Sequence, residues 1–399
     1  KADGNNKYGI QFSNKRHIHH GIHRPQPDRL DQILKSEKAA EHETEERGKN
    51  TCTADDSRKI NMLELVKKLS LLNGTSGRED GVREFIINEI KDCAESYEVD
   101  PLGNLIVFKK GRKTPKNKVM LDAHMDEVGF MITSINSDGT LGFERIGGID
   151  KRVMLGRAVT VGEKKINGVI GLKPVHMTKG DEKMSMPEKM YIDIGADNAE
   201  QAAKLVSLGD CAYFNSDFVE FGDGFIKCKA LDDRAGCAIL INMIKSDLPY
   251  DMYFNFATGE EVGLGSAGTA AYRVDPDYAI VVETTTAADL ADVPENKKVC
   301  KLGEGAVISF MDRRTIYSRE LFDKAFEIAK RDGIKAQVKS AVAGGNNAGV
   351  IHKTAGGIKT VTVSMPCRYL HSPSCVLKAE DITESERIIR ALAEEFADA

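Results

Sequence analysis

The chain of 399 residues carries 56 Lys and Arg against 61 Asp and Glu, giving a formal net charge of −5. No basic surplus indicates nucleic-acid binding, and no apolar run approaches the length of a membrane span. The length allows two domains with a sizeable core.

The eight cysteines include no CxxC pair. Several of them, such as Cys237 in AGCAILI, lie inside apolar runs, where a reduced and buried thiol is expected. Reduced thiols favour a cytoplasmic location.

Residues 1–61 differ from the rest of the chain in composition and in hydrophobic pattern. They are polar, have almost no apolar periodicity and include His17, His19, His20 and His23. Such a stretch does not bury enough apolar surface to offset the entropy of ordering, so we expect a disordered extension. A metal-binding arm is the alternative. The folded part is expected to begin near Met62.

Helix and strand patterns alternate over 62–128. The segment 62–74 predicts an amphipathic helix closed by Gly74, and Ser76 and Glu79 form a capping-box pattern before a second helix. Two strands joined by a turn at 101–104 follow, and a further strand ends at His124.

The hydrophobic pattern of the sequence changes over 129–221. Short β-like runs alternate there with glycines and turns, and helical periodicity nearly vanishes. We therefore predict a small β-rich domain inserted into an α/β domain.

Strand–helix alternation resumes at Ile226. Helices are predicted within 229–245, 265–274, 318–333, 346–354 and 380–398, and strands within 251–257, 277–283, 335–340 and 358–366.

Metal-binding side chains stand where strand-like runs meet a turn or a helix start. The segments are AHMDE with His124 and Asp126, LDDRAG with Asp232, TGEEVG with Glu260 and Glu261, VVETTTAAD with Glu283, and YLHSP with His371. Such positions converge at the carboxyl edge of an α/β sheet. Two imidazoles and three carboxylates, one able to bridge, are what a two-metal hydrolytic centre needs.

Taken together, these motifs resemble the M42 metallo-aminopeptidases, which include the tetrahedral and the glutamyl aminopeptidases. The resemblance covers roughly 62–397. It implies an α/β sandwich with a mixed central sheet, formed by 62–128 and 222–399. A small β-barrel-like dimerisation domain at 129–221 would interrupt it.

The resemblance also implies a role for each site residue. Asp232 would bridge two divalent metal ions, zinc by preference, with cobalt or manganese as alternatives. One ion would also take His124 and Glu283, and the other Glu261 and His371. Asp126 would orient the His124 imidazole, and Glu260 would be the general base.

The implied activity is removal of N-terminal residues from peptides by a homo-oligomer, a dodecamer built from dimers. Two positions depart from the family pattern. Glu283 stands where many relatives carry Asp, and Asn347 replaces an acidic residue in a GGTDAG-like stretch, which bears on substrate selection. Asp233 is expected to cap a helix or pair with Arg234.

Other readings stay open. His176 and His352 are expected to be surface or packing histidines. A carboxypeptidase or an N-acyl amino-acid amidohydrolase could use the same metal scaffold. A non-catalytic assembly protein that binds metal only for structure is a further alternative. The presence of Glu260 argues against it, because a structural metal site needs no general base. A glycosidase is disfavoured because the chain has no Trp for a sugar platform.

Overall fold

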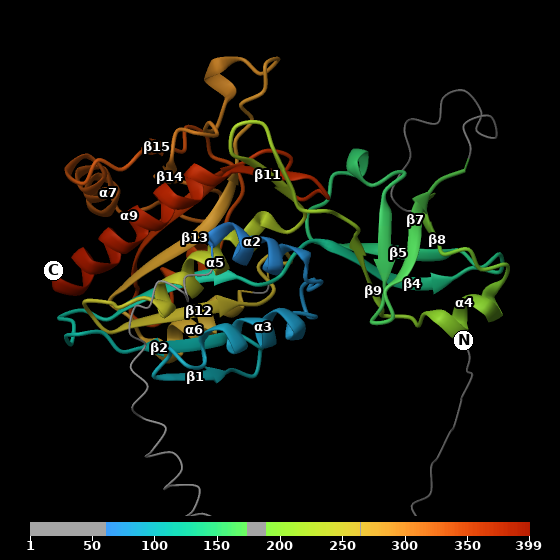
Figure 1. The fold of residues 1–399 in the computed structure, drawn as a ribbon, viewed down its shortest axis with the longest axis horizontal. Helices are drawn as coiled ribbons and strands as arrows, with labels where there is room; N and C mark the ends of the chain where they lie inside the picture. Colours follow the sequence, from blue (N-terminus) through green and yellow to red (C-terminus); the bar gives the residue numbers. More distant parts are fainter. Residues whose placement is uncertain (1–60, 174–188, 264) are drawn as a thin grey trace, which may run out of the picture. The chain divides into compact units, whose positions relative to one another are not determined.

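The computed structural model describes residues 61–173, 189–263 and 265–399 (Figure 1). They all belong to one compact unit, Cys52–Ala399. The expected N-terminal extension, apart from Asn61, and His176 lie outside the described residues.

An eight-stranded mixed sheet forms the centre of this unit. Its order is β1 (Ser96–Val99), β2 (Leu105–Lys109), β12 (Met252–Ala257), β3 (Val119–His124), β13 (Tyr278–Thr286), β16 (Lys359–Cys367), β14 (Ala306–Ile308) and β15 (Ala336–Val338). The four central strands, β12, β3, β13 and β16, are parallel. Every residue of β3 is buried because helices cover both faces of the sheet.

The helices lie in two layers around this sheet (Figure 1). The larger layer contains α2 (Met62–Leu71), α3 (Asp80–Ile90), α5 (Leu231–Lys245), α7 (Arg319–Arg331) and α9 (Ala379–Asp398). The opposite face is covered by α6 (Ser266–Val274) and α8 (Ala348–Ile351). Alternate residues of β3 divide between the two cores: Leu121 packs into the larger and Met120 into the smaller.

The inserted stretch forms a closed barrel in the order β4-β5-β8-β7-β6-β9. The strands are β4 (Gly129–Ile135), β5 (Leu141–Ile146), β6 (Ala158–Val161), β7 (Ile166–Gly171), β8 (Tyr191–Asp193) and β9 (Cys211–Phe214). Phe130 packs edge-to-face against Phe143 and Phe214, with ring centroids 5.0 and 5.1 Å apart. Closure gives every strand of the barrel two neighbouring strands. The α/β fold with a mixed sheet and a barrel-like domain is thus confirmed.

The far end of the expected insertion is not part of the barrel. The strand β10 (Val219–Phe221) pairs with β11 (Phe225–Cys228), which pairs with β17 (Cys375–Lys378). A hairpin turn with Gly222 and Gly224 at positive φ joins β10 to β11. The barrel strands therefore end at Phe214, before the predicted limit of 221.

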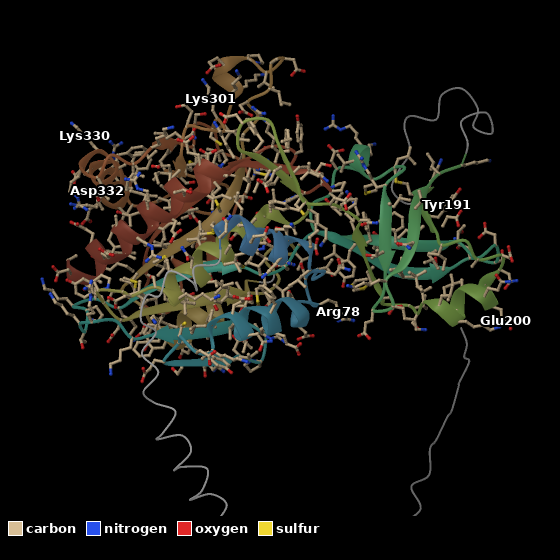
Figure 2. All side chains as sticks on the ribbon, viewed as in Figure 1. Arg78, Tyr191, Glu200, Lys301, Lys330 and Asp332 are labelled. Carbon is tan, nitrogen blue, oxygen red and sulfur yellow. The ribbon has the colours of Figure 1, made fainter. Side chains whose placement is uncertain are left out.

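Two short features in the inserted stretch differ from the sequence expectation. Helix α4 (Ala199–Leu205) lies against the barrel, although no helix was expected there; Figure 2 labels Glu200 on it and Tyr191 on β8. A single-turn 3-10 helix also occurs there at Lys151–Val153, and another lies outside the inserted stretch at Glu295–Lys297.

The predicted capping box before α3 is wrong. The Ser76 hydroxyl instead donates to the Asp126 carboxylate at 2.6 Å, and Glu79 accepts the backbone N–H of Gly77 and Gly259. Helix α3 has no side-chain cap. The local pattern is overridden by contacts to segments far along the chain.

Two further properties concern the described residues as a whole. Six of their cysteines are free and buried, as predicted for several of them, and Cys93 is half-buried. None of their helices is both long and apolar enough to cross a membrane.

Candidate metal centre and active site

The strands that were expected to deliver the site residues are neighbours in the sheet. His124 is the last residue of β3 and stands beside Ala257, the last residue of β12, two residues before the Gly-Glu-Glu segment. Glu283 lies on β13, opposite Ser364 of β16. Parallel strands thus bring segments from distant parts of the chain to one edge of the sheet.

The predicted metal ligands form two groups that share Asp232. Potential donor atoms of His124, Asp232 and Glu283 lie within 4.8 Å of one another, as do those of Asp232, Glu261 and His371. The Asp232 Oδ1 atom lies 3.5 Å from His124 Nε2, and its Oδ2 atom lies 3.3 Å from His371 Nε2. Each oxygen of one carboxylate therefore faces a different imidazole.

The remaining two carboxylates complete these groups. Glu283 Oε1 lies 3.4 Å from His124 Nε2, and Glu261 Oε2 lies 3.3 Å from His371 Nε2. The backbone at Asp232 departs from helical φ/ψ, so this residue precedes the regular part of α5. His371 follows β16 in a loop and has a positive φ of 56°.

Asp126 connects the parts of the site. Its Oδ1 lies 3.3 Å from His124 Nδ1, and its carboxylate accepts the backbone N–H of both Glu260 and Glu261 at 3.1 Å. Burial alone would raise the pKa of Asp126. The hydrogen bond from His124 and that side chain's charge outweigh burial and hold the pKa below its usual value. One carboxylate thus fixes an imidazole and the adjacent glutamates.

The donor set fits divalent cations. His124 Nε2 and Asp232 Oδ1 are buried and find no hydrogen-bond partner among the described residues. Burial, aided by the nearby charge of Asp232, outweighs the opposing charge of His124 and raises the pKa of Glu283 to about 8. Crowded, buried carboxylates beside two imidazoles form a donor set that divalent cations stabilise by neutralising its negative charge.

Glu260 stands apart from the two groups. It lines the cavity beside them, and its backbone N–H, rather than its carboxylate, is held by Asp126. Burial raises the pKa of Glu260 to about 7. A carboxylate with such a pKa accepts and returns a proton near neutral pH.

A cavity of about 690 Å³ opens onto these residues. It is also lined by Gly148, which comes from the barrel side and whose carbonyl oxygen lies 2.9 Å from His371 Nδ1. Arg313, Arg314 and Lys339 line the cavity as well. The sequence analysis did not identify these three cations, because no motif surrounds them and only tertiary structure brings them to the cavity.

The other residues singled out in the sequence have structural contacts. Asp233 caps α5 as predicted, since its Oδ1 accepts the Gly236 N–H at 3.1 Å. Arg234 does not pair with it and donates instead to backbone carbonyls, including that of Met125. His352 Nδ1 lies 2.5 Å from the Ala348 carbonyl.

Asn347 does not line the cavity. It is buried and donates to Asp122 Oδ2 at 2.9 Å, while its neighbour Asn346 reaches the cavity wall. The substitution at Asn347 therefore does not bear on substrate selection by direct contact, contrary to the expectation from the sequence.

Comparison with known proteins identifies the family. The model of the M42 glutamyl aminopeptidase family matches residues 103–388, well over half of the chain. The chain belongs to the M42 family. It is therefore a hydrolase of the aminopeptidase type, and membership implies the use of divalent metal ions.

Several M42 relatives match over most of their length. A protein of Acetivibrio thermocellus is 42% identical over 331 residues, covering 82% of this chain and 97% of its own. The lysyl aminopeptidase of Pyrococcus furiosus is 30% identical, covering 84% and 97%. The structure of the Pyrococcus horikoshii TET1 peptidase, described as assembling into a tetrahedron or a large octahedral shell, is 37% identical with a TM-score of 0.74, covering 84% and 99%.

Proposed function

We propose that this M42 enzyme is a dinuclear metal-dependent aminopeptidase that removes N-terminal residues from peptides. The observation that carries the proposal is the placement of Asp232, with one carboxylate oxygen toward each histidine. A bridging carboxylate with one imidazole and one further carboxylate on each side suits a pair of divalent ions.

The ligand sets follow from the two groups. His124, Asp232 and Glu283 would hold one ion, and Asp232, Glu261 and His371 the other. We propose zinc, with cobalt or manganese as alternatives. When bound, such ions polarise the scissile carbonyl and lower the pKa of a water molecule.

The chain's own residues perform the proton transfers. Glu260 takes a proton from the attacking water and returns it to the leaving amine. Asp126 accepts the hydrogen bond from His124 Nδ1 and keeps Nε2 directed toward Asp232 and Glu283. The same carboxylate accepts the backbone N–H groups of Glu260 and Glu261, so one side chain positions the proposed base and a proposed ligand.

We further propose that the barrel, 129–214, mediates assembly into a dodecamer built from dimers, and that 62–128 with the chain after the barrel forms the catalytic domain. The assembly described for the Pyrococcus horikoshii relative supports this. So do the exposed apolar side chains on the inserted stretch, among them Val169 and Leu208.

Blocking the α-amine of the substrate distinguishes an aminopeptidase from an amidohydrolase or a carboxypeptidase. An aminopeptidase binds a free α-amine beside carboxylates, and acetylation removes that charge-assisted contact, which costs about 1.5–3 kcal/mol. We expect Leu- or Glu-p-nitroanilide to be cleaved at least about tenfold faster than its N-acetylated form. Faster cleavage of the acetylated substrates would identify an amidohydrolase, and shortening of peptides from the other end a carboxypeptidase.

A further inference from the structure

Arg314 is a cation in the wall of the active-site cavity. It lies in the loop between β14 and α7 and lines the same cavity as Glu260. Asp312 holds this loop, because its carboxylate accepts the backbone N–H of Arg314 at 2.7 Å and the hydroxyl of Tyr317 at 2.5 Å. The backbone of Arg314 therefore has a defined place in the cavity wall.

Two glycines make room for the side chain of Arg314. A Cβ atom at Gly345 would lie 2.9 Å from Arg314 Cγ, and one at Gly349 would lie 2.6 Å from Arg314 Cβ. At both positions the three nearest atoms belong to Arg314. Neither glycine has a positive φ, so backbone conformation does not require glycine there. Two of the three glycines in the GGNNAG stretch thus leave space that Arg314 fills.

The guanidinium of Arg314 lies near the proposed general base. A Cβ atom at Gly263 would lie 2.9 Å from Arg314 Nη2. The Gly263 N–H donates to the Glu260 carbonyl at 2.8 Å, closing a turn that keeps the Cα atoms of these two residues within about 7 Å. Burial raises the pKa of Glu260, and the charge of Arg314 is one of those that oppose the rise.

This guanidinium has no protein partner in the described part of the chain. No hydrogen bond or ion pair joins it to a described residue, and the side chain is exposed. A guanidinium presents its N–H donors in a planar fork that matches the two oxygens of a carboxylate. Arg314 is therefore suited to bind a carboxylate of the substrate.

The proposed reaction decides which part of the substrate Arg314 meets. Glu260 returns its proton to the leaving amine, which is the nitrogen of the substrate's second residue. A group near Glu260 therefore faces the leaving part of the peptide. In a dipeptide or tripeptide the C-terminal carboxylate follows that nitrogen by about 3–7 Å, because each residue spans at most about 3.3–3.6 Å. The free carboxylate of a short peptide thus comes within reach of Arg314.

Resting on the proposed function, we propose that Arg314 binds the C-terminal α-carboxylate of dipeptides and tripeptides, and that the enzyme favours short peptides with a free carboxyl end. An unmodified peptide always carries this group, whereas a side-chain carboxylate is present only in some sequences. In longer peptides the terminal carboxylate lies beyond Arg314, and the preference disappears. The competing role for Arg314 is to balance the charge of Glu260, which would affect every substrate alike.

The test compares kcat/KM for a tripeptide X-Ala-Ala and for its C-terminal amide, with X the better of Leu and Glu in the p-nitroanilide assay. We expect the metal-loaded wild type to prefer the free acid at least about fivefold, because the amide loses a charge-assisted contact at an exposed site. Arg314→Met should bring the ratio close to one, chiefly through KM for the acid, and Arg314→Lys should retain part of the preference. Arg319→Met, exposed on α7, is the matched control and should keep the wild-type ratio.

A displaced arginine gives a second test. Gly349→Ala leaves Arg314 in the chain, but the added Cβ takes space that the arginine side chain occupies. Alanine suits the helix α8, on which residue 349 lies. We expect this variant to lower the acid-to-amide ratio as well.

A binding measurement completes the test. An uncleavable X-Ala analogue, with a methylene in place of the scissile carbonyl, should raise the Tm of the wild type more as the free acid than as the amide. Arg314→Met should abolish this difference.

Three outcomes would contradict the proposal. Equal kcat/KM for acid and amide in the wild type, or an equal loss on acid, amide and p-nitroanilide in Arg314→Met, would overturn it and leave the aminopeptidase proposal standing. A preference for X-Asp-Ala amide over X-Asn-Ala amide, without a preference for the free acid, would assign Arg314 to a side-chain carboxylate instead. Failure to hydrolyse any free-amine substrate would overturn both proposals.

Discussion

At the scale of single residues, Glu260 and its neighbour Glu261 have different surroundings. Glu261 faces His371 at 3.3 Å, whereas Glu260 lines the cavity with a pKa raised by burial to about 7. Consecutive side chains that diverge in this way would allow Glu261 to bind a metal ion while Glu260 transfers the proton, as we propose.

Glu260→Gln tests that separation. The substitution keeps the size of the side chain and removes the proton acceptor, so kcat should fall roughly a hundredfold or more while two metal ions per chain remain. Metal content by mass spectrometry, measured beside kcat, checks both parts. Asp232→Asn is the contrasting variant and should lose metal. An active Glu260→Gln enzyme would exclude Glu260 as the base.

Asp381 provides a pH-dependent prediction away from the active site. Its carboxylate accepts the N–H groups of Gly303 and Gly305, each at 2.8 Å, and burial raises its pKa to about 6. The folded state therefore favours the protonated carboxyl. The stability that it contributes is fully present below about pH 4 and is lost as the pH rises through about 6.

Asp381→Asn should remove this pH dependence. Relative to the variant, the wild type should lose at most about 3 kcal/mol of unfolding free energy between about pH 4 and pH 7. Urea denaturation of both proteins across this range measures the difference. Parallel pH profiles would show that Asp381 titrates normally.

At the scale of elements, a buried ion pair joins the two connections between the barrel and the sheet. Glu127 lies between β3 and β4, and Lys229 lies between β11 and α5. The Lys229 ammonium is 2.6 and 2.8 Å from the two carboxylate oxygens and also donates to the Leu72 carbonyl. The pair therefore fixes α5, which carries Asp232, against the strand that carries His124.

Lys229→Met should destabilise the protein by about 3–5 kcal/mol, because it removes the cation closest to the buried Glu127 and leaves only Arg234, 3.8 Å away. Denaturant midpoints measure the loss, and adding Glu127→Gln should recover part of it. The exposed pair Arg319–Asp323 is the control: Arg319→Ala should cost about 1 kcal/mol or less. Equal losses at the two sites would contradict a structural role for the buried pair.

The elements also show which parts of the fold can be predicted from the sequence. Long apolar runs identified β3, β12, β13 and β16, and hence the edge where His124 and Glu283 meet. Short elements such as β14 and α4 were missed because their residues gain order from tertiary packing rather than local pattern. Ser76 and Arg314 were missed as functional neighbours for the same reason. Their partners lie far along the chain, and no spacing rule connects them.

At the scale of the whole molecule, the proposed assembly depends on the barrel. Light scattering should give a mass many times the 43.8 kDa of one chain. Val169 and Leu208 are 48% and 65% exposed on the inserted stretch, and the double variant Val169→Asp/Leu208→Asp should yield smaller species. Leu102→Asp, at an exposed turn of the sheet domain, is the control. A monomeric wild type would remove the assembly role.

The order of strands in the sheet also governs how the chain is made. During synthesis β3 emerges before the barrel, yet both of its neighbours, β12 and β13, emerge after it. All strands of the barrel have been synthesised once Phe214 has left the ribosome. The backbone groups of β3, by contrast, stay unpaired until β12 and β13 have been synthesised. Such long-range pairing is slow and exposes strand edges to other chains. His371 is translated last among the proposed site residues, so a nascent chain that ends before it would lack part of the proposed metal centre.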